Sequence, residues 1–129
     1  LETKATVLDK GLSSLLLDLN RRGMLNETMV VVASEFGRTP TIKSGRNGRD
    51  HHPKAYSALL AGGGIKEGYV YGKSDERAHN VASKSMSPED LNATIAYAMG
   101  INLEEVIFSP SKRPFKVAHD GQPALDLLG

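Results

Sequence analysis

The sequence predicts a single α/β domain over residues 1–129, with a mostly parallel sheet and flanking helices. Three observations predict this fold class. An amphipathic helical pattern over residues 3–22 is followed by an unbroken apolar run over residues 29–33, and a long polar loop over residues 34–54 then leaves that run. A helix that leads into a strand buried on both faces, with a polar loop at the strand's carboxyl end, is typical of α/β sheets.

The first two elements have clear local signals. Leucines spaced three and four residues apart give residues 3–22 one apolar side, and Gly23 is a natural end for the helix. The apolar run contains three consecutive valines, Val30 to Val32. They favour a buried strand because β-branched side chains suit extended backbone.

The elements that follow are shorter. We expect a second strand over residues 56–61, an extended segment over residues 69–71 and a polar loop over residues 73–86. Three glycines, Gly62 to Gly64, end the second strand. They lack the Lys-Ser/Thr of a phosphate-binding loop, so we interpret them as a tight turn.

A second helix has the strongest start signal in the chain. Ser87 is the expected N-cap, Pro88 the first helical residue, and Asp90 the partner that completes a capping box. Gly100 ends this helix. A short strand over residues 115–118 and a helical turn from Pro123 are expected in the tail.

Composition excludes several classes of function. The chain has no cysteine, which excludes disulfides, cysteine-ligated zinc and a thiol nucleophile. The net charge of +1 provides no overall field that would select a nucleic acid or a membrane surface, so neither is expected as a partner. No apolar stretch is long enough to span a bilayer. The chain begins with Leu1 rather than Met, and we interpret it as a fragment of a longer protein.

The polar loop contains most of the residues suited to chemistry. Its carboxylates and imidazoles are Glu35, Asp50, His51 and His52. Carboxylate with imidazole binds zinc, manganese or iron, and carboxylate alone favours calcium or magnesium. Its guanidinium groups, which match phosphate or sulfate oxygens, are Arg38, Arg46 and Arg49, with Lys43 beside them. Each residue alone also has an ordinary structural explanation, but their concentration in one loop favours a site.

Several strings resemble an uncharacterised sulfatase-like family of the alkaline phosphatase superfamily. They are EFGRTP at 35–40, GRDHHP at 48–53, LLAGGGIKEGYVYGKSDE at 59–76 and PEDLNATIAYAMGI at 88–101. The stretch from Leu17 to Arg38 is also similar to a sulfatase segment that ends in a Ser-Asp-His-Gly metal motif. Phe36 stands where that motif has its histidine, and Asn92 stands where the family's helix has another.

The resemblance implies a partial alkaline phosphatase/sulfatase-like fold and a function. The chain would be the C-terminal part of a metal-dependent phosphate- or sulfate-ester hydrolase, inactive alone because the nucleophile lies outside it. Glu35, Asp50, His51 and His52 would bind a divalent metal (zinc, manganese or calcium), and Arg38, Arg46 and Arg49 would bind the anion. The parent protein would be exported to the periplasm or beyond.

Two alternatives stay open, namely a non-catalytic binding or structural module of the same fold, and a metal-free anion-binding module. A fragment would also expose apolar surface that normally meets its missing half, so we expect self-association or a mobile loop.

Overall fold

The structure is a computed structural model that describes residues 2–45 and 47–129. Its α-helices are α1 (Glu2–Arg21) and α2 (Pro88–Ala98). A short 3₁₀ turn, η1 (Leu25–Glu27), follows α1, and another, η2 (Leu125–Leu127), lies near the C-terminus. Both predicted helices are confirmed with bounds that differ by a residue or two. No helix in the described part of the chain combines the length and apolar character that crossing a membrane requires.

The strands are short and pair only as antiparallel two-stranded ribbons within the described residues. β1 (Val30–Val32) pairs with β4 (Leu59–Ala61), and β2 (Gly37–Arg38) pairs with β3 (His51–His52). β5 (Lys73–Ser74) pairs with β6 (Val81–Ser83), and β7 (Ile107–Phe108) pairs with β8 (Pro114–Phe115).

The predicted parallel α/β sheet, and with it the partial alkaline phosphatase/sulfatase-like fold, is therefore wrong. Val30 lies opposite Ala61 and Val32 opposite Leu59, so the chain returns alongside β1 in the antiparallel sense. A parallel return needs a crossover, usually a helix, that carries the chain back to the starting end. Residues 33–58 contain no helix in their described part, and the polar loop instead folds back on itself as the β2–β3 ribbon.

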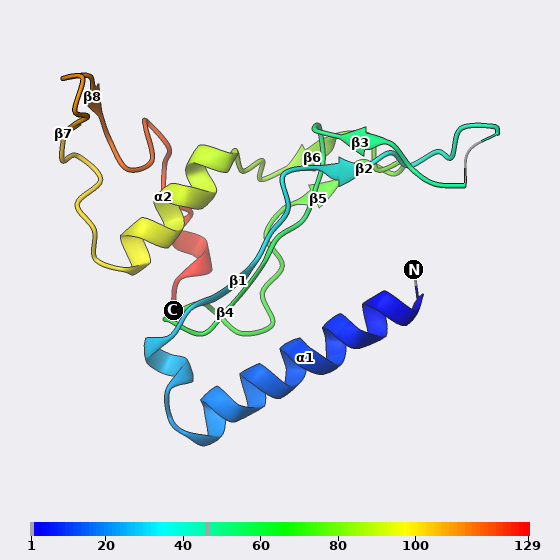
Figure 1. Ribbon diagram of the computed structural model, residues 1–129, viewed down its shortest axis with the longest axis horizontal. Helices are drawn as coiled ribbons and strands as arrows, with labels where there is room; N and C mark the ends of the chain where they lie inside the picture. Colours follow the sequence, from blue (N-terminus) through cyan, green and yellow to red (C-terminus); the bar gives the residue numbers. More distant parts are fainter. Residues whose placement is uncertain (1, 46) are drawn as a thin grey trace.

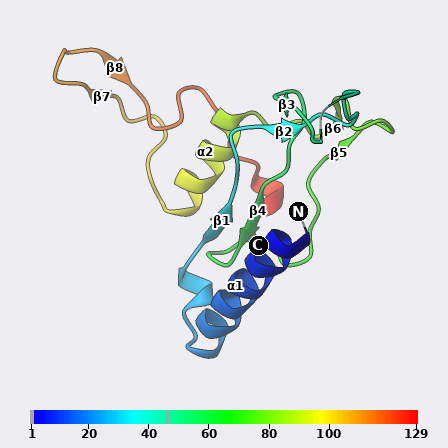
Figure 2. The same cartoon turned by 45° about the vertical axis from the view of Figure 1, so that its right-hand side comes forward.

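The elements spread outward from the β1–β4 ribbon. Figure 1 shows α1 running along one side of this ribbon. The β2–β3 and β5–β6 ribbons lie together beyond the end where β1 leads towards β2. α2 lies on the other side, and the β7–β8 ribbon projects beyond it. The second view shows the same arrangement, so the β2–β3 and β5–β6 ribbons are neighbours in space (Figure 2).

A tight turn after β4 brings the backbone against the start of β1, as the glycine run predicts. Gly62 has a φ of +70°, and a Cβ there would lie 2.3 Å from the Thr28 carbonyl oxygen and 2.5 Å from that of Leu25. The amide of Gly63 also donates to the Leu25 carbonyl at 2.9 Å. Only glycine combines this backbone conformation with so close an approach.

The buried core is small and lies between α2 and the tail. The buried hydrophobic residues of the described chain are Ala93, Ala96, Ala118 and Leu127, and Thr94 is buried beside them. α2 begins with the predicted capping box, in which the Ser87 hydroxyl accepts from the Asp90 amide at 3.0 Å and the Asp90 carboxylate accepts from the Ser87 amide at 2.9 Å. By contrast, no described residue of α1 is buried.

Candidate functional site

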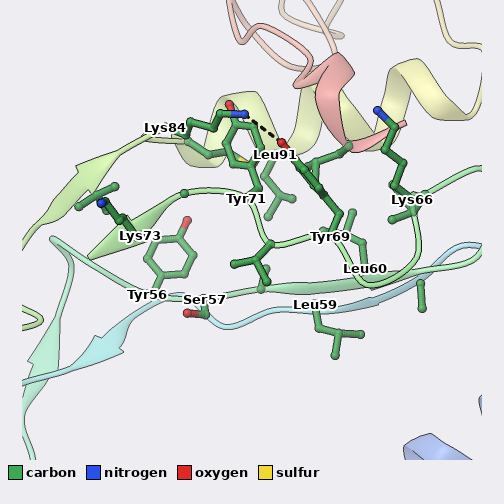
Figure 3. Close-up of a pocket in the computed structure, with 18 of the residues that line it drawn as sticks. Tyr56, Ser57, Leu59, Leu60, Lys66, Tyr69, Tyr71, Lys73, Lys84 and Leu91 are labelled. Atoms are coloured by element: carbon green, nitrogen blue, oxygen red, sulfur yellow. Dashed lines mark hydrogen bonds between the residues drawn. The ribbon is translucent and has the colours of Figure 1, made fainter. Parts of the chain in front are cut away.

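A cavity of about 1240 Å³ opens between the C-terminal half of α1, the strand β4 and the segment that leads to α2. Figure 3 shows its wall, which combines aliphatic side chains with tyrosines and lysines. The labelled part of this wall contains Tyr56, Ser57, Leu59, Leu60, Lys66, Tyr69, Tyr71, Lys73, Lys84 and Leu91. Concave sites with an apolar wall and a few polar groups are the usual form of ligand pockets.

Lys84 is the most connected polar side chain of the cavity. Its ammonium donates to the Tyr69 hydroxyl at 2.9 Å and to the Asp126 carboxylate at 2.6 Å. It also lies 5.6 Å from the Tyr69 ring centroid and 5.4 Å from that of Tyr71 (Figure 3). The hydrogen bond to Asp126, and then that to Tyr69, raise the pKa of Lys84, so this residue is a fixed cation.

The cavity is positively charged. Among its described lining residues, the cations are Arg38, Lys54, Lys66, Lys73 and Lys84, and the anions are Glu35 and Glu67. Cations that line a concave surface focus their field, so a negatively charged ligand is attracted and a cation is repelled. Glu35 and Arg38 reach this cavity from the loop that the sequence singles out.

The adjacent histidines of that loop lie on opposite faces of β3, because successive side chains alternate along a strand. The ring of His51 stacks on Phe36 with centroids 4.8 Å apart and an interplanar angle of 15°. His52 instead faces the β5–β6 ribbon, where its Nε2 donates to the His79 carbonyl oxygen at 2.8 Å. This hydrogen bond fixes the tautomer of His52 and leaves Nδ1 as the ring nitrogen that can bind a proton or a metal.

Asp75 organises the loop that brings His79 to His52. Its carboxylate accepts hydrogen bonds from the amides of Arg77 at 3.1 Å, His79 at 2.8 Å and Asn80 at 3.0 Å. These bonds, the one from His79 foremost, lower the pKa of Asp75 and keep it ionised. The His52 and His79 ring centroids are 6.4 Å apart.

The remaining predicted site residues of the loop make contacts within it. Asp50 forms an ion pair with Lys43 at 2.7 Å, and this pairing raises the pKa of Lys43. The Arg49 guanidinium donates to the carbonyl of Thr39 at 2.8 Å and to that of Pro40. Arg46 lies outside the described residues. Arg38 is thus the predicted anion-binding residue that faces the cavity.

A metal site does not assemble from these side chains alone. Across residues 2–45 and 47–129, no three His, Asp or Glu side chains come together as a group that could hold a metal ion. Stacking on Phe36 directs His51 away from His52, and Lys43 neutralises Asp50. The predicted ligands Glu35, Asp50, His51 and His52 therefore share a region of the chain without forming a coordination sphere in its described part.

The sequence gives weak signals for the other residues of the site. Lys84, Tyr69 and Tyr71 sit in segments without periodicity, and only the fold brings them together. For His79, an available signal is the Asp75 carboxylate four residues earlier, since aspartate commonly accepts from amides a few residues ahead in a turn.

The fold and the site together define a chain of short antiparallel ribbons and two helices around a cationic, tyrosine-lined cavity. The sequence matches the family described as Protein of unknown function (DUF1501) over residues 1–128, and the chain belongs to that family. No sulfatase or alkaline phosphatase family matches, so the predicted membership of a sulfatase-like family is wrong. No curated protein and no solved structure matches the chain.

Proposed function

We propose that this chain is the ester-binding part of a phosphate- or sulfate-ester hydrolase-like protein. The observation that carries the proposal is that Glu35 and Arg38, from the polar loop, line the same cavity as four lysines. Phosphate and sulfate esters join a compact negative charge to an organic group, which complements a wall where five described cations outnumber Glu35 and Glu67. The charge would meet the cations, and the organic group would lie against tyrosine and leucine side chains.

The cations with the freest side chains are the best candidates for contacting the ester. Lys84 is held by Asp126 and Tyr69, and the Lys66 ammonium donates to the Asp126 carbonyl at 3.1 Å. Arg38 and Lys73 are exposed residues of the wall, and guanidinium matches two ester oxygens at once. We assign the principal ester contact to Arg38 and supporting charge to Lys73.

Hydrolysis would need groups from outside the described chain. His52, with Nε2 donating to a backbone carbonyl, has the arrangement that metal-binding histidines commonly show, but a zinc, manganese or calcium site needs further ligands. We therefore assign no catalytic step to a metal here. The interpretation of residues 1–129 as part of a longer hydrolase, with a nucleophile elsewhere, stays a proposal, as does export of that parent.

A non-catalytic binding module is the second candidate, and the stacking of His51 on Phe36 favours it. An aromatic ring that covers one face of the imidazole restricts how a ligand can approach it. In this alternative the cavity binds the anion, and no hydrolysis follows with any metal.

Calorimetric titration with an aryl phosphate, an aryl sulfate and the neutral parent phenol tests the proposal. We expect both esters to bind and the phenol to bind at least about tenfold more weakly, since charge is the attraction. Arg38→Gln combined with Lys73→Gln should weaken ester binding by about tenfold or more. The matched control is Lys10→Gln, a lysine of α1 that does not line the cavity.

Equal affinity for the ester and the phenol, or an equal loss in the Lys10→Gln control, would refute ester binding. Following phenol release by the longer parent protein, with a chelator and then with added zinc, manganese or calcium, separates the two candidates, because the proposed nucleophile lies outside this chain. Binding without phenol release under every metal condition would select the non-catalytic module.

A further inference from the structure

The Asp126 carboxylate lies against a group of cations at one end of the cavity wall. It accepts a hydrogen bond from the Lys84 ammonium at 2.6 Å, and Lys84 also donates to the Tyr69 hydroxyl at 2.9 Å. The Lys66 ammonium donates to the backbone carbonyl of Asp126 at 3.1 Å and lies 5.9 Å from the Tyr69 ring centroid. Lys66, Tyr69 and Lys84 all line the cavity. Two ammonium groups and a hydroxyl thus meet where the chain places a carboxylate of its own.

An unusual backbone contact holds Lys84 in this position. Lys84 has a φ of +46°, a left-handed conformation that residues with a Cβ rarely adopt. Gly72 has a φ of +74°, and a Cβ there would lie 2.8 Å from the Lys84 carbonyl oxygen, so only glycine permits this close approach. The contact brings the Lys84 ammonium to 5.4 Å from the Tyr71 ring centroid. An unfavourable conformation that its surroundings hold at a cavity points to a functional position.

The ion pair between Lys84 and Asp126 is accessible, so a ligand can compete for it. The two side chains are 47% and 61% exposed, and exposed ion pairs contribute little to stability because water screens them. The backbone beside Asp126 is held independently, since the Leu127 carbonyl accepts from the Lys66 amide at 2.8 Å and the Leu127 side chain is buried. The Asp126 side chain can therefore rotate away from Lys84 while the tail stays in place.

We propose that Lys66, Lys84 and Tyr69 form a second anion subsite of the cavity, which the Asp126 carboxylate fills and from which an oxyanion group of the ligand displaces it. The Lys84 hydrogen that Asp126 releases is then donated to the ligand oxygen. The Tyr69 hydroxyl accepts from Lys84, so its own O–H can donate to the same anion.

The position of this subsite defines the class of ligand. Figure 3 shows Tyr69 and Tyr71 between Lys66 and Lys73 in the wall. Because Lys73 supports the ester contact proposed above, a ligand that reaches both positions carries two oxyanion groups joined by an organic part that lies along the tyrosines. This ligand class rests on the proposed function, whereas the displacement of Asp126 does not.

Nuclear magnetic resonance titration of the Asp126 carboxyl group, with sodium sulfate as the probe, tests the displacement. The hydrogen bond from Lys84, and then its charge, lower the pKa of Asp126 from its ordinary value of 3.8. Sulfate that replaces the carboxylate at Lys84 should raise this pKa towards 3.8, and further than sodium chloride does at equal ionic strength. Asp90 is the internal control, because backbone amides lower its pKa and the two salts should affect it equally.

Removing the competing carboxylate should tighten sulfate binding. We expect Asp126→Asn to bind sulfate about twofold to fivefold more tightly than the wild type, since the ion pair that sulfate must break is exposed. The matched control is Asp120→Asn, which makes the same charge change in the tail at a side chain that is 98% exposed and lies outside the cavity wall. In a Lys84→Gln background the gain from Asp126→Asn should disappear, with circular dichroism confirming the helix content of each variant.

An aryl bisphosphate, compared with the aryl monophosphate, tests the ligand class. Lys84→Gln should weaken the bisphosphate by about tenfold and the monophosphate by about twofold or less. Equal losses for the two ligands overturn the assignment of a second oxyanion group.

Three results would overturn the displacement itself. They are a pKa of Asp126 that sulfate raises no more than chloride does, an equal gain in Asp126→Asn and Asp120→Asn, and a gain that persists without Lys84. Arg38→Gln combined with Lys73→Gln separates this inference from the proposed function, because sulfate should still raise the pKa of Asp126 in that variant. If the variant binds the ester as the wild type does while Asp126 responds to sulfate, the ester contact alone is refuted.

Discussion

The Thr94 hydroxyl holds the tail against α2, and replacing it measures that attachment. Thr94 is 0% exposed. Its Oγ1 donates to the Asp90 carbonyl at 2.7 Å and accepts from the Ala124 amide at 2.9 Å. Thr94→Val has nearly the same shape but can accept no hydrogen bond, so the Ala124 amide loses its partner in a half-buried position. Leaving such a donor unsatisfied costs about 1–3 kcal/mol.

The matched variant Thr94→Ser keeps the hydroxyl and removes one methyl group. A methyl of this size contributes about 1 kcal/mol when buried. We expect Thr94→Val to lower the free energy of unfolding by about 2 kcal/mol, more than Thr94→Ser does. Urea denaturation followed by circular dichroism measures both, and the slope against urea should not change. Amide exchange adds a local measurement, since only Thr94→Val should expose the Ala124 amide. A valine variant as stable as the wild type, with this amide still protected, would refute the reasoning.

Two further predictions concern Asp90 and the glycine turn. Hydrogen bonds from the amides of Gln122 and then Ser87 lower the pKa of Asp90 from its ordinary value of 3.8. The ionised carboxylate therefore stabilises the fold above that pH, and this stabilisation is lost as the pH falls through the lowered pKa. The stability advantage of the wild type over Asp90→Asn should therefore be largest above about pH 4 and shrink below it in urea titrations; an advantage that does not change with pH would contradict this account. Gly62→Ala should destabilise the protein far more than Gly64→Ala. Both glycines have positive φ, which costs alanine about 1–2 kcal/mol. Only at Gly62 would the new Cβ also lie 2.3 Å from a backbone oxygen. Thermal unfolding of the two variants measures the difference, and equal losses would show that the close approach does not matter.

Local signals predicted α2 well. The residues that start it, Ser87, Pro88 and Asp90, act on one another within a single turn, so the sequence contains the whole interaction. The same holds for α1, whose leucine spacing is a local property, and for the Gly62–Gly64 turn.

The sheet could not be predicted in the same way. The valines of β1 indicated a strand, but its antiparallel partner lies at residues 59–61, and nothing in an apolar run states the direction of its partner. The two residues of β3 are His51 and His52, which have no alternating pattern, so the sequence predicts a loop where the β2–β3 ribbon forms. Whether such short strands form depends on how well they pair with segments that are distant in the sequence.

The residues of the predicted site also fall into two groups, those that line the cavity and those that contact other residues of the loop. Glu35 and Arg38 line the cavity, whereas Phe36 stacks on His51 and Lys43 pairs with Asp50. Whether neighbouring polar residues converge depends on the face to which each one points, and the sequence shows only that they are neighbours.

The location of the buried core implies that parts of the chain open at different cost. The core residues Ala93, Thr94 and Ala96 belong to α2, and Ala118 and Leu127 come from the tail that Asp90 and Thr94 bind. This unit should be the last to unfold, because opening it exposes buried side chains and breaks shielded hydrogen bonds. α1 has no buried residue, so it should detach at lower cost than this unit, although Leu16 and Asn20 line the cavity. Because α1 also forms part of the cavity wall, opening of this helix would remove that wall before the C-terminal unit unfolds.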